Sequence, residues 1–251
     1  MAPVVSDPLA LVAWVHNAET VTYSFFASML NMAAHVALTP ESPARGGTLP
    51  IRYGTGGLVQ ARNTAIEVFL RTECDWLVWL DTDMGFEPDT VDRLIAAADP
   101  TDRPIVGALC YVNHEVERDG LGGYQTRSFP TVYRWAQQRD SGNTGFVTVA
   151  DIPNVDLPED GLIACDATGS ACIAIHRGVF ETIRGNWYGL IASNHDGAPP
   201  FSEDMSFMLR CAQHDIPVHV HTGIATSHLK PVWLSRWQHV SHEPRRAIVG
   251  A

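Results

Sequence analysis

The 251-residue chain carries 17 lysines and arginines against 28 aspartates and glutamates, so its formal net charge is −11. This acidic balance excludes a broad basic surface for nucleic-acid phosphates, although a local strip such as Arg236, Arg245 and Arg246 leaves nucleic acid open as an acceptor. Hydrophobic residues make up 45% and charged residues 18%, which is typical of a folded globular protein and excludes a disordered one.

Segments of strand and helix character alternate along most of the chain, which predicts βαβ units and an α/β fold with a mostly parallel sheet flanked by helices. The expected strands are 9–15, 49–53, 76–80, 104–110, 169–176 and 217–228, and the expected helices are 19–35, 58–71, 88–98, 177–184 and 202–214. Residues 76–80 are five consecutive apolar residues, as in a strand buried on both faces of a sheet.

The segment 111–164 has a weaker pattern, and we interpret it as an insertion. Strand character at 129–135 and 145–152 predicts a small β-hairpin added at the sheet edge. The tail 229–251 shows no period. We therefore expect one domain over 1–251, with this insertion and this tail.

Neither a membrane span nor a secretory signal is visible, so we expect a cytoplasmic protein without stable membrane association. Five scattered cysteines form no C-x-x-C pair, which favours reduced, buried thiols over disulfides or a zinc site.

An acidic pair, Asp81 and Asp83, directly follows the buried strand 76–80. Open α/β sheets bind ligands at this end of their strands, and two carboxylates at i and i+2 can hold Mg²⁺ or Mn²⁺ beside phosphates. The alternative is an acidic turn exposed to solvent.

Two further polar pairs open helices. Arg62 and Asn63 lie near the start of a helix, where they can meet an anion, or Arg62 can pair with Glu67 on the surface. Glu203 and Asp204 follow a serine, a pattern that is also ordinary helix capping.

Other residues carry weaker signals. His219 and His221 alternate with valines, as on a strand with one solvated face, so zinc is disfavoured. Gly169 and Ser170 lack the nucleophile-elbow pattern and suit a small-residue floor under a sugar. Trp187 can stack on a sugar or simply pack.

Four pieces occur together in order and resemble glycosyltransferases of the GT-A fold, particularly small stand-alone family 2-like members of bacteria and phages. They are 56–86 with its D-x-D motif, 166–172, 201–204 and 226–228. The resemblance spans about residues 9–230 and implies a Rossmann-related GT-A sheet. It also implies the host cytoplasm as the location if the protein is phage-encoded.

The resemblance implies transfer of a hexosyl or pentosyl group from a nucleotide-sugar, UDP-sugar foremost, to a hydroxyl, with inversion. It implies Mn²⁺ or Mg²⁺ held by Asp83 directly and by Asp81 and His228 around it. Donor contacts fall to Arg62, Asn63, Asp81, Asp83 and Lys230, although Lys230 alone also fits a plain surface lysine. Asp204 becomes the general base, and acceptor or sugar contacts fall to Gly169, Ser170, Trp187 and Glu203.

Two alternatives stay open. A sugar nucleotidyltransferase would need a glycine- and arginine-rich loop after the first strand, and residues 15–19 supply none. A metal-dependent carbohydrate-binding module would use the acidic pair without catalysis. The acceptor stays open among a protein, a glycan, a small molecule and a modified DNA base, and the oligomeric state is not indicated.

Overall fold

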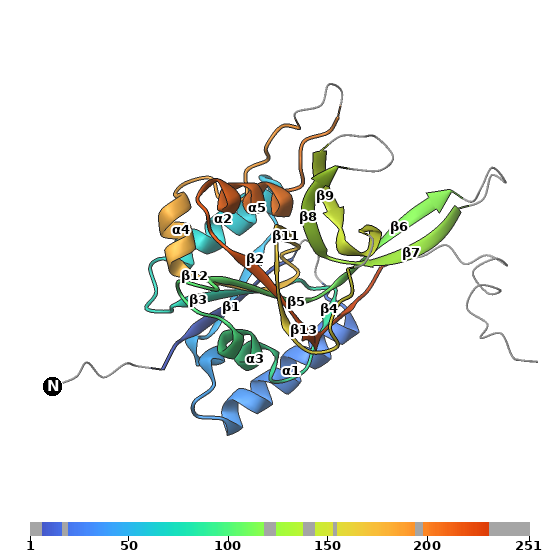
Figure 1. Cartoon of the computed structure of the whole chain (residues 1–251). Helices are drawn as coiled ribbons and strands as arrows, with labels where there is room; N and C mark the ends of the chain where they lie inside the picture. Colours follow the sequence, from blue (N-terminus) through green and yellow to red (C-terminus); the bar gives the residue numbers. More distant parts are fainter. Residues whose placement is uncertain are drawn as a thin grey trace, which may run out of the picture.

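The computed structural model describes residues 7–16, 20–117, 124–137, 144–152, 155–193 and 198–230. Its centre is a seven-stranded sheet in the order β10-β13-β5-β12-β3-β1-β2 (Figure 1). The strands are β1 (Ala10–His16), β2 (Thr48–Arg52), β3 (Trp76–Leu80), β5 (Ile105–Leu109), β10 (Leu162–Cys165), β12 (Cys172–His176) and β13 (Val218–Ala225). β12 is antiparallel to both of its neighbours and β10 to its one neighbour, while the other five strands share one direction.

Helices cover both faces of this sheet (Figure 1). One face packs against α1 (Tyr23–Leu38) and α3 (Thr90–Ala97), and the other against α2 (Gly57–Phe69), α4 (Arg177–Ile183) and α5 (Glu203–Gln213). Short 3₁₀ turns lie at Pro43–Gly46 and Val149–Asp151. The expected α/β class, with a mostly parallel sheet flanked by helices, is confirmed.

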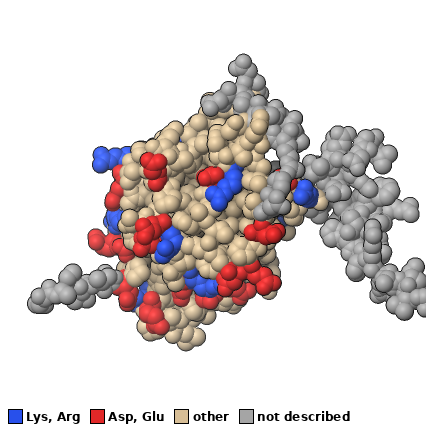
Figure 2. Space-filling model, viewed as in Figure 1, with Lys and Arg blue, Asp and Glu red and all other residues tan. Residues whose placement is uncertain are grey.

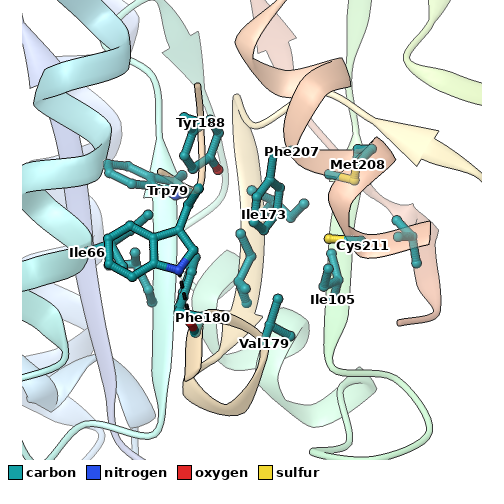
Figure 3. Close-up of a cluster of buried hydrophobic side chains, with 14 of the residues drawn as sticks. Ile66, Trp79, Ile105, Ile173, Val179, Phe180, Tyr188, Phe207, Met208 and Cys211 are labelled. Atoms are coloured by element: carbon teal, nitrogen blue, oxygen red, sulfur yellow. Dashed lines mark hydrogen bonds between the residues drawn. The ribbon is translucent and has the colours of Figure 1, made fainter. Parts of the chain in front are cut away.

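The central strand β3 is buried at every position, as its apolar sequence predicts. Leu77 and Trp79 point into the cluster under α2, α4 and α5, whereas Val78 and Leu80 point into the cluster under α1 and α3. In the first cluster Tyr188 stacks on Phe207 with ring centroids 4.8 Å apart (Figure 3). Close-packed aromatic rings of this kind hold the loop at 188 against the start of α5.

The segment 111–164 differs from the expectation of one hairpin at the sheet edge. It contains two hairpins, β6 (Tyr111–Glu117) with β7 (Tyr124–Pro130), and β8 (Val132–Gln137) with β9 (Thr144–Thr148). The expected strand 129–135 is two strands, because the chain bends at Thr131, whose backbone N–H bonds to the carbonyl of Cys110. β8 also pairs with β11 (Ala167–Thr168) in a separate three-stranded sheet, and β10 forms the edge of the main sheet instead.

A second small pairing positions the end of the described chain. β14 (Ser227–His228) pairs antiparallel with β4 (Met84–Gly85), with His228 opposite Met84. The backbone N–H of Leu229 then donates to the carbonyl of Asp83 at 2.9 Å. Residues far apart in the sequence are thereby brought beside the turn that follows β3.

The remaining expectations concern cysteines, membranes and the tail. All five cysteines are buried and free, as expected. Within the described ranges, no helix combines the length and the hydropathy needed to span a bilayer. The basic strip of Arg236, Arg245 and Arg246 lies outside the described residues. On the face drawn in Figure 2, basic side chains are scattered among acidic ones.

Candidate active site

The candidate site forms where β3 ends and where α2 and α5 begin. The turn after β3 is held by two backbone bonds: Asp81 N–H donates to the carbonyl of Ala171 at 2.8 Å, and Met84 N–H donates to the carbonyl of Asp81 at 3.1 Å. This turn presents Asp81 and Asp83 at the end of the sheet where α/β proteins bind ligands.

Arg62 of α2 is the charged centre of the site. Its side chain is 2% exposed, and its Nη2 lies 3.3 Å from Asp81 Oδ1 and 3.8 Å from Asp204 Oδ1. Burial by itself lowers the pKa of Arg62, but the two carboxylates outweigh it and raise the pKa above its ordinary value. Arg62 is therefore charged and paired with Asp81 and Asp204, and the surface pair with Glu67 is wrong.

Two aromatic rings enclose this guanidinium. Arg62 Cζ lies 5.1 Å from the ring centroid of Trp79 and 5.2 Å from that of Tyr188. Such contacts stabilise a desolvated cation by about 2 kcal/mol. Among the described residues, Nε and Nη1 of Arg62 and Oδ1 of Asp204 have no hydrogen-bond partner. The site thus holds polar atoms with unused bonding capacity.

Asp83 has different partners from Asp81. Its Oδ2 lies 3.1 Å from both His228 Nε2 and Lys230 Nζ. Burial raises the pKa of Asp83. The hydrogen bonds and positive charges of His228 and Lys230 outweigh this effect, so the pKa of Asp83 lies below its ordinary value. Burial raises the pKa of Asp81 against the opposing effect of Arg62. The two carboxylates of the D-x-D motif therefore differ in electrostatic environment.

The hydrogen bonds of His228 indicate whether a metal ion fits at this site. Its Nδ1 lies 2.8 Å from the carbonyl of Tyr111, which only accepts, so Nδ1 carries a proton. When the ring is protonated, Nε2 donates to Asp83 Oδ2; when it is neutral, a cation between Nε2 and Asp83 would satisfy the lone pairs of both. Oxygen and imidazole ligands suit Mn²⁺, and Mg²⁺ needs few protein ligands.

The same residues also limit such a site. Across the described part of the chain, no three His, Cys, Asp or Glu side chains are grouped so that they could hold a metal ion. Asp83 and His228 supply two ligands, and Lys230 competes for the same carboxylate oxygen. A metal would thus need oxygen ligands from a bound phosphate to complete its coordination.

Asp204 and Glu203 lie in the first turn of α5. Ser202 caps this helix, its Oγ accepting from Met205 N–H at 3.4 Å, so the ordinary capping pattern is present. Asp204 nevertheless turns inward to Arg62. Gly169 borders this carboxylate: a Cβ there would lie 3.9 Å from Asp204 Oδ2, in ordinary van der Waals contact. Burial, and then the charge of Asp204, raise the pKa of Glu203.

Three predicted ligand contacts have structural partners instead. Asn63 donates from Nδ2 to Asn186 Oδ1 at 2.7 Å and accepts the N–H of Tyr188 at 3.0 Å. Ser170 is fully buried, with its Oγ 3.1 Å from Tyr188 Oη. The indole of Trp187 is buried and donates to the carbonyl of Phe180 at 2.9 Å. All three hold the segment that places Tyr188 over Arg62. Trp187 packs in the core, which is the second of the two roles considered for it.

A separate cavity of about 440 Å³ borders Asn63. Its polar lining comes from Gln60, Asn63, Glu67 and Asn186, with Gly56, Val59, Gly185 and Trp187 completing it. None of the acidic residues around Arg62 lines it. This cavity is therefore adjacent to the candidate site but does not contain it.

Sequence reasoning missed the roles of Trp79 and Tyr188 as the walls around Arg62. Trp79 stands two residues before Asp81, and this spacing places both on the same face of an extended chain. That spacing was an available signal for Trp79. The position of Tyr188 depends on packing between segments distant in sequence, and no local pattern indicates it.

The fold and this geometry define a class of protein: an α/β protein with a carboxylate-rich site at the C-terminal edge of its sheet. No protein-family model matches the sequence, and no curated protein matches it. Among solved structures, the chain is similar to A197 from STIV, with 14% identity and a TM-score of 0.51, covering 89% of this chain and 86% of that chain. This similarity shows a shared fold.

A second solved structure is that of GalNAc-T7 with UDP, GalNAc and Mn²⁺. The identity is 10% and the TM-score 0.49, over 89% of this chain and 44% of that chain. The present chain thus corresponds to less than half of that protein's length.

Proposed function

We propose that this protein is a glycosyltransferase of the GT-A type, which transfers a sugar from a nucleotide-sugar to an acceptor hydroxyl. The observation that carries the proposal is the convergence of Asp81 and Asp204 on the buried Arg62 at the end of β3. One carboxylate belongs to the turn expected to bind the donor, and the other begins the helix expected to face the acceptor. A single buried cation thus connects the two halves of the proposed reaction centre.

We assign donor binding to the turn after β3 and to the end of the described chain. Asp83 and His228 are the proposed direct ligands of Mn²⁺ or Mg²⁺, with Asp81 beside them. When bound, the metal neutralises the charge of the donor diphosphate. Lys230 lies close enough to Asp83 to reach the same phosphates. A uridine diphosphate donor and a hexosyl or pentosyl group are parts of the proposal that rest on the family resemblance.

We assign proton transfer to Asp204. The acceptor oxygen forms the new bond to the anomeric carbon, while the bond from that carbon to the diphosphate breaks and its electron pair leaves with the diphosphate. The acceptor proton passes to the carboxylate of Asp204, whose side chain is 23% exposed although its Oδ1 is buried against Arg62. Attack from the side opposite the leaving group inverts the anomeric centre. Glu203 lies beside Asp204 in the same helical turn, where its carboxyl group can form a hydrogen bond with the acceptor.

A panel of nucleotides tests the proposed donor site. Thermal unfolding is measured with the diphosphates of uridine, guanosine, thymidine and cytidine, each with and without Mn²⁺. We expect one base to raise the melting temperature only when Mn²⁺ is present, because ligand binding stabilises the folded state. Asp83→Asn should abolish this response. Asp92→Asn on α3, where Asp92 pairs with His35, is the control and should leave it unchanged.

Product analysis then separates the proposed reaction from its alternatives. Incubation with the matching nucleotide-sugar should release nucleoside diphosphate and free sugar, water replacing the acceptor. Pyrophosphate release from a nucleoside triphosphate would instead identify a nucleotidyltransferase. Sugar binding without any nucleotide response would identify a carbohydrate-binding module. No response to any nucleotide would contradict the glycosyltransferase proposal.

A further inference from the structure

Three aromatic side chains that have no role in the proposed reaction form a cluster beside α5. Trp135 lies on β8, Phe146 on β9, and Phe201 immediately precedes the N-cap of α5. The ring centroids of Trp135 and Phe146 are 4.9 Å apart, and that of Phe201 lies 6.1 Å from each of them. We call these three residues the aromatic platform.

The platform is more exposed than a structural cluster requires. Trp135 is 41% exposed, although burying an aromatic side chain is a main source of stability. Phe146 packs against the core cluster under α2, α4 and α5, whereas Trp135 and Phe201 belong to neither core cluster. Trp135 thus leaves part of an aromatic ring accessible to a ligand.

Two connections place the platform next to Asp204. Tyr133 and Trp135 are two residues apart on β8 and so share one face of that strand. Tyr133 pairs with Ala167 of β11, two residues before Gly169, which lies beside Asp204. Burial, and then the negative charge of Asp204, raise the pKa of Tyr133. The face of β8 that carries Trp135 therefore continues toward the proposed general base.

The second connection runs through Phe201. Its backbone N–H donates to the carbonyl of Ile191 at 2.9 Å, and its own carbonyl accepts from Ser206 Oγ at 3.2 Å. These bonds hold Phe201 against the first turn of α5, the turn that carries Glu203 and Asp204. The ring of Phe201 is thus positioned by the same helix start as the proposed base.

We propose that the aromatic platform is the acceptor subsite and that it takes a carbohydrate, with the C–H face of a pyranose ring packed on Trp135. This inference rests on the proposed function. The π face of an aromatic ring is electronegative and attracts the weakly positive C–H groups of a sugar. Next to the platform stand groups that hydrogen-bond sugar hydroxyls, namely Tyr133, Glu203 and Asp204. A hydroxyl of the stacked sugar then faces the base that removes its proton.

The charges around the platform favour a neutral sugar over a nucleic acid, although bases also stack on aromatic rings. Glu203, Asp204 and Asp166 contribute carboxylates, while Arg134 pairs with Asp166 at 3.9 Å and the buried Arg62 lies 3.8 Å from Asp204. Phosphate groups would be repelled by this surface, and the net charge of −11 adds to the repulsion. A carbohydrate carries no such charge.

Saturation-transfer NMR tests the subsite without a donor. The probes are the methyl glycosides of glucose, galactose and N-acetylglucosamine, and an oligothymidylate. We expect at least one glycoside to bind the wild type through its ring C–H groups and to bind W135A about tenfold or more weakly. W135F, which keeps a π face, should bind better than W135L, which keeps the bulk alone. F26A removes a 51% exposed ring on α1, across the sheet, and should bind as the wild type does.

The outcomes are distinct. Equal glycoside binding by wild type, W135L and W135A, or no binding by the wild type, overturns the subsite. Binding of oligothymidylate that depends on Trp135 also overturns it, in favour of a nucleic acid. If W135A does not fold, the comparison of W135F with W135L carries the test. Failure of the nucleotide panel would overturn the proposed transferase, whereas the NMR result bears on the sugar subsite alone.

Discussion

Arg62 Nη2 lies 3.8 Å from Asp204 Oδ1, with the guanidinium almost fully buried and the carboxylate 23% exposed. The same nitrogen is 3.3 Å from Asp81 Oδ1, so one buried cation balances two carboxylates that come from different elements. Removing that cation would leave two like charges close together in a region of low dielectric constant. The stability of the site and its chemistry therefore depend on the same residue.

Arg62→Met should lower the free energy of unfolding by about 3 kcal/mol or more, because it leaves Asp81 and Asp204 without their counter-ion. Arg62→Lys should lower the free energy of unfolding by less, because it keeps the positive charge. It still loses the planar group that lies between Trp79 and Tyr188. Denaturant unfolding measures both. The matched control is Arg127→Met, whose ion pair with Asp151 is largely exposed and should contribute about 0–1 kcal/mol. Equal losses at Arg62 and Arg127 would contradict a buried charge centre.

Asp204→Asn should reduce turnover of the nucleotide-sugar by about 10²-fold or more, because the amide cannot accept the acceptor proton. Metal-dependent nucleotide affinity, measured by calorimetry, should stay within a few-fold of the wild type. A variant with normal turnover would remove Asp204 as the base. If nucleotide binding is lost instead, Asp204 contributes to donor binding and is not assigned as the base.

His228→Ala should weaken Mn²⁺-dependent nucleotide binding about tenfold to a hundredfold, the usual cost of disturbing a metal site. His228→Gln is the milder variant, since an amide can still bond to the carbonyl of Tyr111. Calorimetry with and without Mn²⁺ distinguishes the metal contribution from that of the nucleotide. If the metal-free affinity falls equally, His228 contacts the nucleotide directly and is not a metal ligand.

His176 makes stability depend on pH. Its Nδ1 accepts the N–H of Gly178 at 3.2 Å at the start of α4, and burial lowers the pKa of His176 below its ordinary value. The unfolded chain thus binds the proton more readily than the folded protein. Stability is fully present above the ordinary histidine pKa of ~6.5 and falls as the pH drops through 6.5 to the folded pKa.

The measurement for His176 is the free energy of unfolding across this pH range. His176→Asn keeps a side chain that can cap α4 but does not titrate, so the slope should become shallower. His219, whose pKa burial also lowers, should leave a residual slope. His214→Asn, at an exposed position after α5, is the control. An unchanged slope in His176→Asn would show that protonation of His176 does not limit stability.

The positions of the regular elements follow closely from local sequence patterns. The five apolar residues of β3 predict a strand with the bounds that the structure has, and the helices at Gly57–Phe69 and Glu203–Gln213 fall within one or two residues of the expected ranges. These predictions succeed because the spacing of apolar residues along a short stretch of sequence shows which face of a strand or helix is buried. The prediction for the insertion is wrong because its short strands pair with each other and with β11. Pro130 also ends the first of these strands just before the bend at Thr131, inside the expected strand 129–135.

The sequence by itself determined the α/β class and the position of Asp81 and Asp83 at the end of a buried strand, because apolar periodicity and the direction of the chain are local properties. Only the tertiary structure decided that Arg62 pairs with Asp81 and Asp204, that Asn63 holds the Tyr188 segment, and that Trp135, Phe146 and Phe201 meet. These contacts join segments far apart in the chain. They depend on the order of strands in the sheet and on how side chains pack across it, which no local pattern encodes.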